Sequence, residues 1–230
     1  MIIAGLQNLS LVDYPGHLAA AVFTQGCNFR CGYCQNPELV TCESDFGYSV
    51  DDFFRYISSR KDMIEGVVVT GGEPVIHKDL PEFLHRIKKM GFKVKLDTNG
   101  SDPDMLEKLF RDYLVDYVAI DIKTSLEKYG LLTDIPDIGQ KVAESVLFTV
   151  LWSFDHEFRT TCVPGIVEEE DIRKMGELVK GSAKFCLQQF RPIVTFDKEL
   201  SKVKPYAPEK IREFADILRP YVKEVEIRGL

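Results

Sequence analysis

Short apolar runs alternate with amphipathic helical patterns along this chain, and their order constrains the fold more than any other feature. Strands are expected at 18–24, 65–70, 92–97, 117–121, 158–163 and 185–190, with a last short strand at 224–227. Helices are expected at 50–59, 80–90, 103–113, 138–152, 168–180 and 208–218. Ser49, with Asp52 three residues later, is expected to cap the first of these helices, and Asp79 the second, with Pro81 in the first turn of the second. Such alternation forms an α/β fold in which helices lie outside a parallel sheet.

About six strand–helix units fall short of the eight that close a full barrel. We therefore expect a curved partial (β/α)6-type barrel, with an open doubly wound sheet as the alternative. The chain has 230 residues and no convincing linker, which indicates a single domain over 1–230. In either architecture, chemistry is expected at the carboxyl ends of the strands.

Charge and composition exclude several classes of function. The net charge of −7 argues against a non-specific nucleic-acid binder, which needs Lys and Arg contacts to phosphates. The N-terminus lacks the basic region and continuous apolar region of a signal peptide, and the apolar run at 18–23 is too short to cross a bilayer. We therefore expect a cytoplasmic protein with no membrane contact. Three of the six cysteines fall within eight residues, a spacing that in a reducing compartment indicates a metal site.

These three cysteines, Cys27, Cys31 and Cys34, have the spacing C-x₃-C-x₂-C. Three thiolates on one loop can hold three irons of a [4Fe–4S] cluster and leave the fourth iron without a protein ligand. The alternative is a zinc site that uses Cys42 as its fourth ligand, but zinc sites usually combine two cysteine pairs and no second pair is present. Cys42, Cys162 and Cys186 are expected to be small buried apolar residues.

Other polar motifs follow the expected strands. Gly71-Gly72-Glu73-Pro74 follows the second strand, and its glycines would let backbone carbonyls approach a ligand closely. Asp97 ends the third strand and Asp121 the fourth, with Lys123 two residues later and expected on the same side. A carboxylate and an ammonium that face one pocket suit a zwitterionic ligand that carries a ribose.

The cysteine spacing, with Tyr33 before the third cysteine, resembles the radical S-adenosylmethionine superfamily and its pattern C-x₃-C-x-aromatic-C. The resemblance implies a partial α/β barrel that binds a [4Fe–4S] cluster and S-adenosylmethionine. It also implies reductive cleavage of S-adenosylmethionine to methionine and a 5′-deoxyadenosyl radical, which abstracts a hydrogen atom. Gly71, Gly72 and Glu73 would bind the amino end of the cofactor.

Two further motifs, Asp97-Thr98-Asn99-Gly100 and Asp121-Ile122-Lys123, resemble those of enzymes that activate glycyl radical enzymes. By this resemblance, Asp97 would approach the cofactor amino group, and Lys123 and Asp121 would contact its carboxylate and ribose. Asp97, Thr98 and Asp121 would match a monovalent-cation site. The same resemblance places further residues at the cofactor: Tyr33, Asn36, Asn99 and Arg159.

Within that group the chain most resembles anaerobic ribonucleoside-triphosphate reductase activating proteins. The likeness is carried by Gly5-Leu6-Gln7, by Leu11-Val12-Asp13-Tyr14-Pro15-Gly16 and by Cys34-Gln35-Asn36-Pro37. Pyruvate formate-lyase activases carry His at the position of Gln35. The resemblance covers about residues 18–192, which would be the core, with a helix and strand extension over 193–230.

The resemblance implies an enzyme that generates a glycyl radical on a partner, expected to be anaerobic ribonucleoside-triphosphate reductase. It also implies a flavodoxin or ferredoxin-type reductant. One alternative is a radical enzyme that acts on a small molecule, and another is a non-catalytic Fe–S or zinc module. The segment 123–140 is expected to be long and irregular. The sequence leaves open the oligomeric state and whether this segment is a lid or a docking surface.

Overall fold

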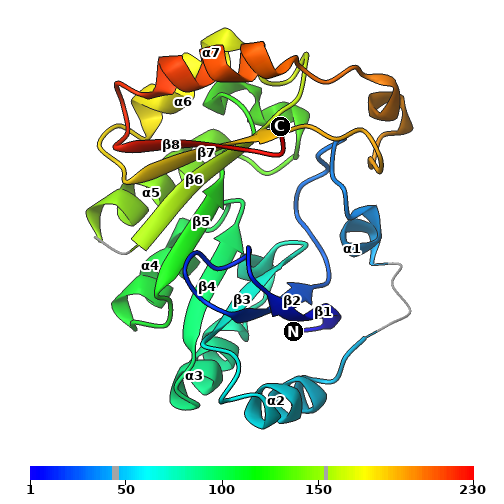
Figure 1. Cartoon of the computed structure of the whole chain (residues 1–230), viewed down its shortest axis with the longest axis vertical. Coiled ribbons are helices and arrows are strands. Elements are labelled where there is room, and N and C mark those ends of the chain that lie inside the picture. The colour runs from blue at the N-terminus through cyan, green and yellow to red at the C-terminus, as the bar shows by residue number, and fades with distance from the viewer. Residues whose placement is uncertain (43–46, 153–154) are drawn as a thin grey trace. The chain divides into compact units, whose positions relative to one another are not determined.

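The computed structural model describes residues 1–42, 47–152 and 155–230, and these form an α/β fold whose strand order in the sheet follows the chain order (Figure 1). The strands are β1 (Ile3–Ser10), β2 (Ala19–Thr24), β3 (Gly66–Gly71), β4 (Lys93–Thr98), β5 (Tyr117–Asp121), β6 (Asp155–Cys162), β7 (Lys184–Gln189) and β8 (Glu224–Arg228). The predicted alternation of strands and helices is confirmed.

The helices have nearly the predicted bounds, except for α1, which was not predicted. They are α1 (Pro37–Thr41), α2 (Val50–Ser59), α3 (Leu80–Lys89), α4 (Pro103–Arg111), α5 (Ile138–Leu151), α6 (Glu169–Leu178) and α7 (Pro208–Leu218). Three short 3₁₀ helices join them, namely η1 (Pro74–Ile76), η2 (Leu126–Leu131) and η3 (Lys198–Lys202). Among the described residues, no helix combines the length and the apolar character needed to cross a lipid bilayer.

The described chain divides into two compact units, which we call the first and the second unit. The first unit consists of residues 1–28, 38–98 and 104–118. The second unit consists of residues 29–37, 99–103 and 119–230. The cysteine loop therefore begins in the first unit and ends in the second.

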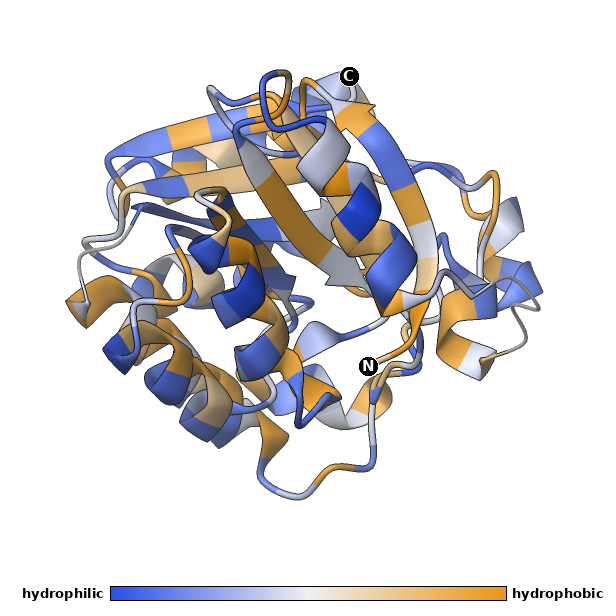
Figure 2. Ribbon diagram, turned by 90° about the horizontal axis from the view of Figure 1, so that it is seen from below, coloured by the Kyte–Doolittle hydropathy of each residue, from blue (hydrophilic) through white to orange (hydrophobic). Residues whose placement is uncertain are grey.

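In the first unit, β2, β3 and β4 form parallel pairs, with Ala21 opposite Val68 and Val69 opposite Leu96. Side chains on both faces of β2 and β3 are buried, which explains why these two strands are nearly continuous apolar runs. Strand β4 instead carries polar residues, among them Lys95 and Asp97. The helices instead alternate hydrophilic and hydrophobic residues around their circumference, as Figure 2 shows. Phe53 and Phe54 of α2 pack against Phe83 of α3. The ring centroids of Phe53 and Phe54 lie 5.4 and 5.3 Å, respectively, from that of Phe83.

Strand β1 was not expected from the sequence. It pairs with β2 in the antiparallel sense, with irregular register near both ends. Only Ile3 and Ser10 of this strand are buried, while Gln7, Asn8 and Leu9 are exposed. A strand buried at its ends alone has no alternation of apolar and polar residues, so the pattern that predicts strands is missing.

In the second unit, β6, β7 and β8 form parallel pairs, and α6 and α7 lie along them (Figure 1). The segment after β5 was predicted to be long and irregular. It is partly ordered by η2, whose Tyr129 is fully buried. Part of the segment between Lys123 and the start of α5 is therefore regular structure anchored in the core.

Two predicted helix caps have different outcomes. Ser49 caps α2 as predicted, because its Oγ accepts a hydrogen bond from the Asp52 backbone N at 3.0 Å. Asp79 occupies the position before α3, but its side chain makes no capping hydrogen bond. The prediction for Asp79 is wrong, because its carboxylate accepts from the N-terminal ammonium of Met1 instead. Pro81 lies in the first turn of α3, as expected.

Candidate active site

The Gly71-Gly72 turn packs directly on the start of the cysteine loop, within the first unit. Gly72 N donates to Thr24 O, and Glu73 N donates to Gly26 O, each at 2.8 Å. A Cβ added to Gly72 would lie 1.9 Å from Gly26 O, and one added to Gly71 would lie 2.2 Å from Thr24 N. The motif therefore needs glycine because two backbone segments touch, a reason that the sequence alone did not supply.

Glu73 joins the ends of β3 and β4. Its side chain is almost fully buried, with the residue 2% exposed. Glu73 Oε1 accepts from Thr98 Oγ1 at 2.6 Å and from the Val75 backbone N at 3.2 Å. These bonds fix the carboxylate at the carboxyl ends of adjacent strands.

Asp97 lies beside Lys95, a residue that sequence reasoning did not single out. Lys95 Nζ is 2.5 Å from Asp97 Oδ1, and Lys95 is 1% exposed. A lysine buried to this extent needs a charged partner. The spacing of Lys95 and Asp97 could have predicted this pair, because residues two apart in a strand face the same side.

The second half of the cysteine loop is held on two sides within the second unit. The Arg30 backbone N donates to Leu132 O at 2.7 Å, next to η2. On the other side, the Asp197 backbone N donates to Gly32 O at 2.8 Å, and Gln35 Nε2 donates to Arg191 O at 3.1 Å. These bonds hold the backbone around Cys31 and Cys34 in a fixed conformation.

Cys31 is buried and lies within the electrostatic influence of Lys123 and Asp121. Burial raises the pKa of the Cys31 thiol, and the positive charge of Lys123 opposes that rise. Burial also raises the pKa of the neighbouring Tyr33 well above its usual range, so Tyr33 remains a protonated phenol. A cation beside a cysteine favours the thiolate that iron binding requires.

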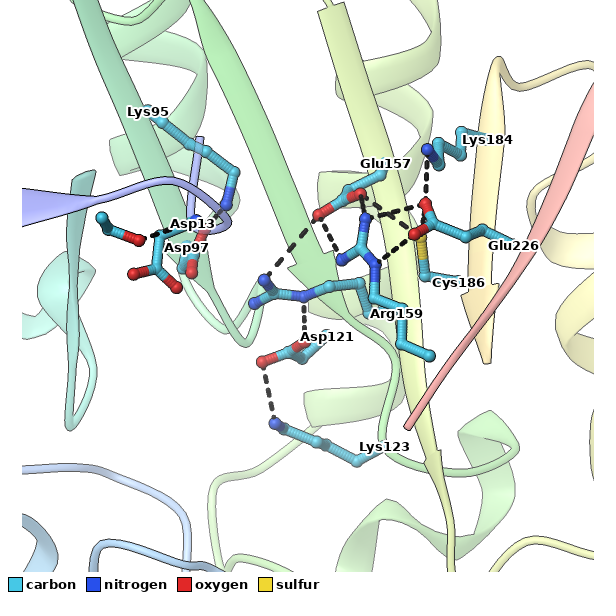
Figure 3. Close-up of polar contacts among 12 residues, drawn as sticks. Asp13, Lys95, Asp97, Asp121, Lys123, Glu157, Arg159, Lys184, Cys186 and Glu226 are labelled. Carbon is cyan, nitrogen blue, oxygen red and sulfur yellow. Dashed lines mark hydrogen bonds and ion pairs between the residues drawn. The ribbon is translucent and has the colours of Figure 1, made fainter. Parts of the chain in front are cut away.

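Asp121 and Lys123, which were predicted from the strand end to face one pocket, form one charged group with Arg159 (Figure 3). Only the family resemblance had placed Arg159 at the cofactor. Lys123 Nζ is 3.1 Å from Asp121 Oδ2, and Arg159 Nε is 2.8 Å from Asp121 Oδ1. Burial opposes ionisation of Asp121, but Arg159 and Lys123 outweigh it and hold the pKa of Asp121 well below its usual range. Burial likewise opposes the charge of Lys123, but Asp121 outweighs it and raises the pKa of Lys123.

This group remains accessible to a ligand, because the side chains of Asp121 and Lys123 are 26% and 21% exposed. Lys123 lies just beyond the end of β5, two residues after Asp121. Its backbone N donates to Tyr129 Oη at 3.0 Å, and this bond helps to fix the lysine near the aspartate. The structure thus brings together Cys31, Tyr33, Asp121, Lys123 and Arg159.

Four further residues that the sequence singled out lie outside this charged group. Asn99 is buried and its Oδ1 accepts from the Ser101 backbone N at 3.0 Å, so its amide oxygen shapes the turn after β4. Asn36 is exposed on the cysteine loop. Cys162 and Cys186 are buried, as predicted, and burial raises the pKa of Cys162 to about 12.

The prediction that Cys42 is buried is wrong, because this residue is exposed. It has a positive φ of 61° just after α1, a turn conformation that no apolar periodicity signals. A Cβ placed on Gly26 would lie 3.7 Å from Cys42 Sγ. Cys42 therefore lies close to the start of the cysteine loop, and its relation to the metal site needs a direct test.

The comparisons with known proteins decide the family. The model of the radical SAM superfamily matches residues 21–179, which include the cysteine loop and every strand from β2 to β6 in whole or in part. The chain belongs to the radical SAM superfamily. This family uses a [4Fe–4S] cluster and S-adenosylmethionine, so this chain is an enzyme of that class. The alternative of a non-catalytic Fe–S or zinc module is therefore excluded.

Curated relatives indicate which group of radical SAM enzymes this chain belongs to. The chain is 34% identical over 234 residues to a protein of Methanocaldococcus jannaschii that is provisionally named a glycyl-radical enzyme activating enzyme, and the match covers 100% of this chain and 96% of that protein. It is 27% identical to the pyruvate formate-lyase-activating enzyme of Streptococcus mutans, over 92% of this chain and 88% of that enzyme. This radical SAM enzyme thus belongs with the activators of glycyl radical enzymes.

Solved structures show the same fold. Streptococcus suis SuiB bound to S-adenosylmethionine matches with a TM-score of 0.66 and 15% identity, over 90% of this chain and 49% of SuiB. This chain therefore spans about half of SuiB. A radical SAM methyltransferase from Sphaerobacter thermophilus matches with a TM-score of 0.67 and 17% identity, over 96% of this chain and 69% of the methyltransferase. These likenesses confirm the predicted radical SAM type of α/β fold.

The residues present fit both cofactors of the family. Cys27, Cys31 and Cys34 offer three sulfur donors within eight residues, which is the donor chemistry that iron–sulfur clusters use. Lys123 and Arg159 offer cations for a carboxylate, and Asp121 offers oxygen acceptors for hydroxyl groups. The buried carboxylate of Glu73 and the partly buried carboxylate of Asp97 suit an ammonium-like nitrogen.

Proposed function

We propose that this chain activates an anaerobic ribonucleoside-triphosphate reductase by generating a glycyl radical on it. The observation that carries the class of activity is the match, over 100% of this chain and 96% of the relative, to the Methanocaldococcus jannaschii protein provisionally named a glycyl-radical enzyme activating enzyme. The reductase as partner is supported by the segment Leu11–Gly16 and by Gln35, where pyruvate formate-lyase activases carry His. The reductant is of the flavodoxin or ferredoxin type.

In this proposal Cys27, Cys31 and Cys34 are the protein ligands of the cluster. When bound, the cluster and S-adenosylmethionine supply the one-electron chemistry that begins hydrogen-atom abstraction. The protein holds Cys31 and Cys34 on a backbone fixed by hydrogen bonds at Arg30, Gly32 and Gln35. It also places the Lys123 cation near Cys31 and so offsets part of the cost of ionising a buried thiol.

The remaining site residues orient the cofactor. Lys123 and Arg159 bind its carboxylate, and Asp121 accepts hydrogen bonds from the ribose. Asp121 does so as an anion, since its two cationic neighbours keep it ionised at neutral pH. Gly71, Gly72, Glu73 and Asp97 bind the amino end, and Tyr33, Asn36 and Asn99 complete the pocket. A monovalent cation would use Asp97, Thr98 and Asp121, in competition with Lys95, Lys123 and Arg159.

The substrate in this proposal is the backbone of a glycine in an extended loop of the reductase. Abstraction of a hydrogen atom requires the glycine α-carbon to be held close to the reacting carbon in an ordered geometry. A loop can be presented in this way when its parent protein docks on the activase. The face near residues 123–140 is the proposed docking surface.

The test is an anaerobic mixture of reconstituted activase, a reductant, S-adenosylmethionine and a candidate reductase. We expect a glycyl signal in the electron paramagnetic resonance spectrum of the reductase, with 5′-deoxyadenosine formed in proportion. The Cys31→Ser protein serves as a control that cannot hold the complete cluster. A glycyl signal that forms on pyruvate formate-lyase but not on the reductase would show that the partner is pyruvate formate-lyase. Cofactor cleavage that only a small metabolite stimulates would favour the small-molecule alternative.

A further inference from the structure

A chain of buried and half-buried charges extends from Asp121 to the last strand, within the second unit. Glu157 and Arg159 lie two residues apart on β6, and Glu226 and Arg228 lie two residues apart on β8. Figure 3 shows the carboxylates of Glu157 and Glu226 close to one another, with Lys184 and Cys186 of β7 beside Glu226. The proposed function uses Asp121, Lys123 and Arg159 and leaves the rest of this network without a role.

Glu157 is the centre of the network. It is 1% exposed, so water cannot solvate its carboxylate, and the negative charge needs a cation beside it. Arg228 supplies it, because Arg228 Nη2 is 2.7 Å from Glu157 Oε2 and Arg228 Nη1 is 3.3 Å from Glu157 Oε1. Arg159 is also near, but its Nη1 is 3.8 Å from Glu157 Oε1, which is beyond hydrogen-bonding distance.

The closer approach of Arg228 to Glu157 allows Arg159 to pair with Asp121. Since Arg228 takes both oxygens of Glu157, Arg159 directs its Nε to Asp121 at 2.8 Å. Without Arg228, the buried carboxylate of Glu157 would have to pair with another cation, because an unpaired buried charge is strongly destabilising. Arg159 already lies on the same face of β6 and is the nearest replacement. Its movement to Glu157 would weaken its bond to Asp121.

A bound metal ion is a weaker explanation of the same cluster. Ligand atoms of Glu157, Cys186 and Glu226 lie within 4.8 Å of one another, a spacing that a metal could use. However, Arg228 binds both carboxylates, and Lys184 Nζ is 2.5 Å from Glu226 Oε2. A metal would have to displace two cations that already compensate these charges. The network is therefore better understood as a structural arrangement of charged pairs.

We propose that Arg228 is a positioning residue for the cofactor site: by binding Glu157, it keeps Arg159 paired with Asp121 and directed toward S-adenosylmethionine. This inference rests on the proposed placement of Arg159 at the cofactor. It gives β8, which lies outside the segment 18–192 of the family resemblance, a part in cofactor binding. Arg228 acts through Glu157 and Arg159 and does not touch the cofactor itself.

The test measures binding of S-adenosylmethionine to the cluster-loaded protein without oxygen, by equilibrium dialysis. A second readout is the change that the cofactor causes in the electron paramagnetic resonance spectrum of the reduced cluster. We compare wild type with Arg228→Met, with the double variant Glu157→Gln/Arg228→Met, and with Glu226→Gln. Thermal unfolding of each variant is recorded in parallel.

We expect Arg228→Met to weaken binding about tenfold, or ~1.4 kcal/mol. The double variant, which leaves no unpaired carboxylate to attract Arg159, should bind within about threefold of wild type. Glu226→Gln also removes a partner of Arg228 but leaves the pair of Arg228 with Glu157, and its affinity should change less than about threefold. A purely structural role for Arg228 predicts no recovery in the double variant.

Wild-type affinity in Arg228→Met, or a double variant no better than the single one, would overturn the inference. If Arg228→Met does not fold, Arg228→Lys replaces it, because one ammonium cannot reproduce the two-point contact of the guanidinium. The outcomes separate this inference from the proposed function. A wild-type protein that binds S-adenosylmethionine but makes no glycyl radical contradicts only the function, and a wild type that does not bind it contradicts both.

Discussion

The contact between the Gly71-Gly72 turn and the cysteine loop makes Gly72→Ala a sharp test of how the site is built. The new Cβ would lie 1.9 Å from Gly26 O, whereas ordinary carbon–oxygen contacts are about 3.3 Å, so one backbone segment must move by about 1.4 Å. That movement breaks the bonds from Gly72 N to Thr24 O and from Glu73 N to Gly26 O. At about 1 kcal/mol each, the loss is at least ~2 kcal/mol.

The displaced residue, Gly26, immediately precedes Cys27, so the substitution should also disturb the cluster. We expect the apoprotein to lose about 4–8 °C in Tm, from ~2 kcal/mol at 2–4 °C per kcal/mol for a chain of this size. We also expect less iron per chain after anaerobic reconstitution. The matched control is Gly130→Ala, because a Cβ at Gly130 meets no atom within 4 Å. Native Tm and iron content in Gly72→Ala would refute the argument.

Three further predictions concern the cluster, the pocket and the charge network. Cys42→Ala should keep the full iron content and cofactor cleavage; loss of the cluster would revive a four-thiolate site. Asp97→Ala, Asp121→Ala and Lys123→Ala should keep the cluster but weaken S-adenosylmethionine binding or its cleavage, and unchanged values in all three would show that the pocket is misassigned. Hydrogen bonds from Arg228 lower the pKa of Glu226 to about 2, so its stabilisation is complete above the unfolded pKa and is lost as pH falls toward 2. The difference in unfolding free energy between wild type and Glu226→Gln, from urea titrations, should therefore shrink between pH 6 and pH 3; a constant difference would contradict the depressed pKa.

The sequence was most informative where a single local rule decides the structure. Val67–Val69 is a continuous apolar run and forms the buried centre of β3. Ser49 with Asp52 three residues later set the start of α2 at the expected residue. Asp121 and Lys123 were expected to face one pocket, and they pair at 3.1 Å.

The sequence was least informative where contacts join residues far apart. The partner of Asp79 is the N-terminus, and no local pattern reveals that pairing. The link from Arg228 to Glu157 spans 71 residues and depends on strands that are assembled only in the fold. The exposed Cys42 depends on a single turn conformation after α1, which composition does not encode.

The central claim is that the hydrogen atom is taken from a glycine of the partner reductase. The most direct measurement uses an anaerobic reductase whose glycines carry deuterium at the α-carbon, mixed with reduced activase and S-adenosylmethionine in unlabelled buffer. The account predicts one deuterium in the 5′-deoxyadenosine that accumulates, together with a glycyl radical signal on the reductase. Unlabelled 5′-deoxyadenosine and no protein radical, with the cofactor fully cleaved, would contradict it.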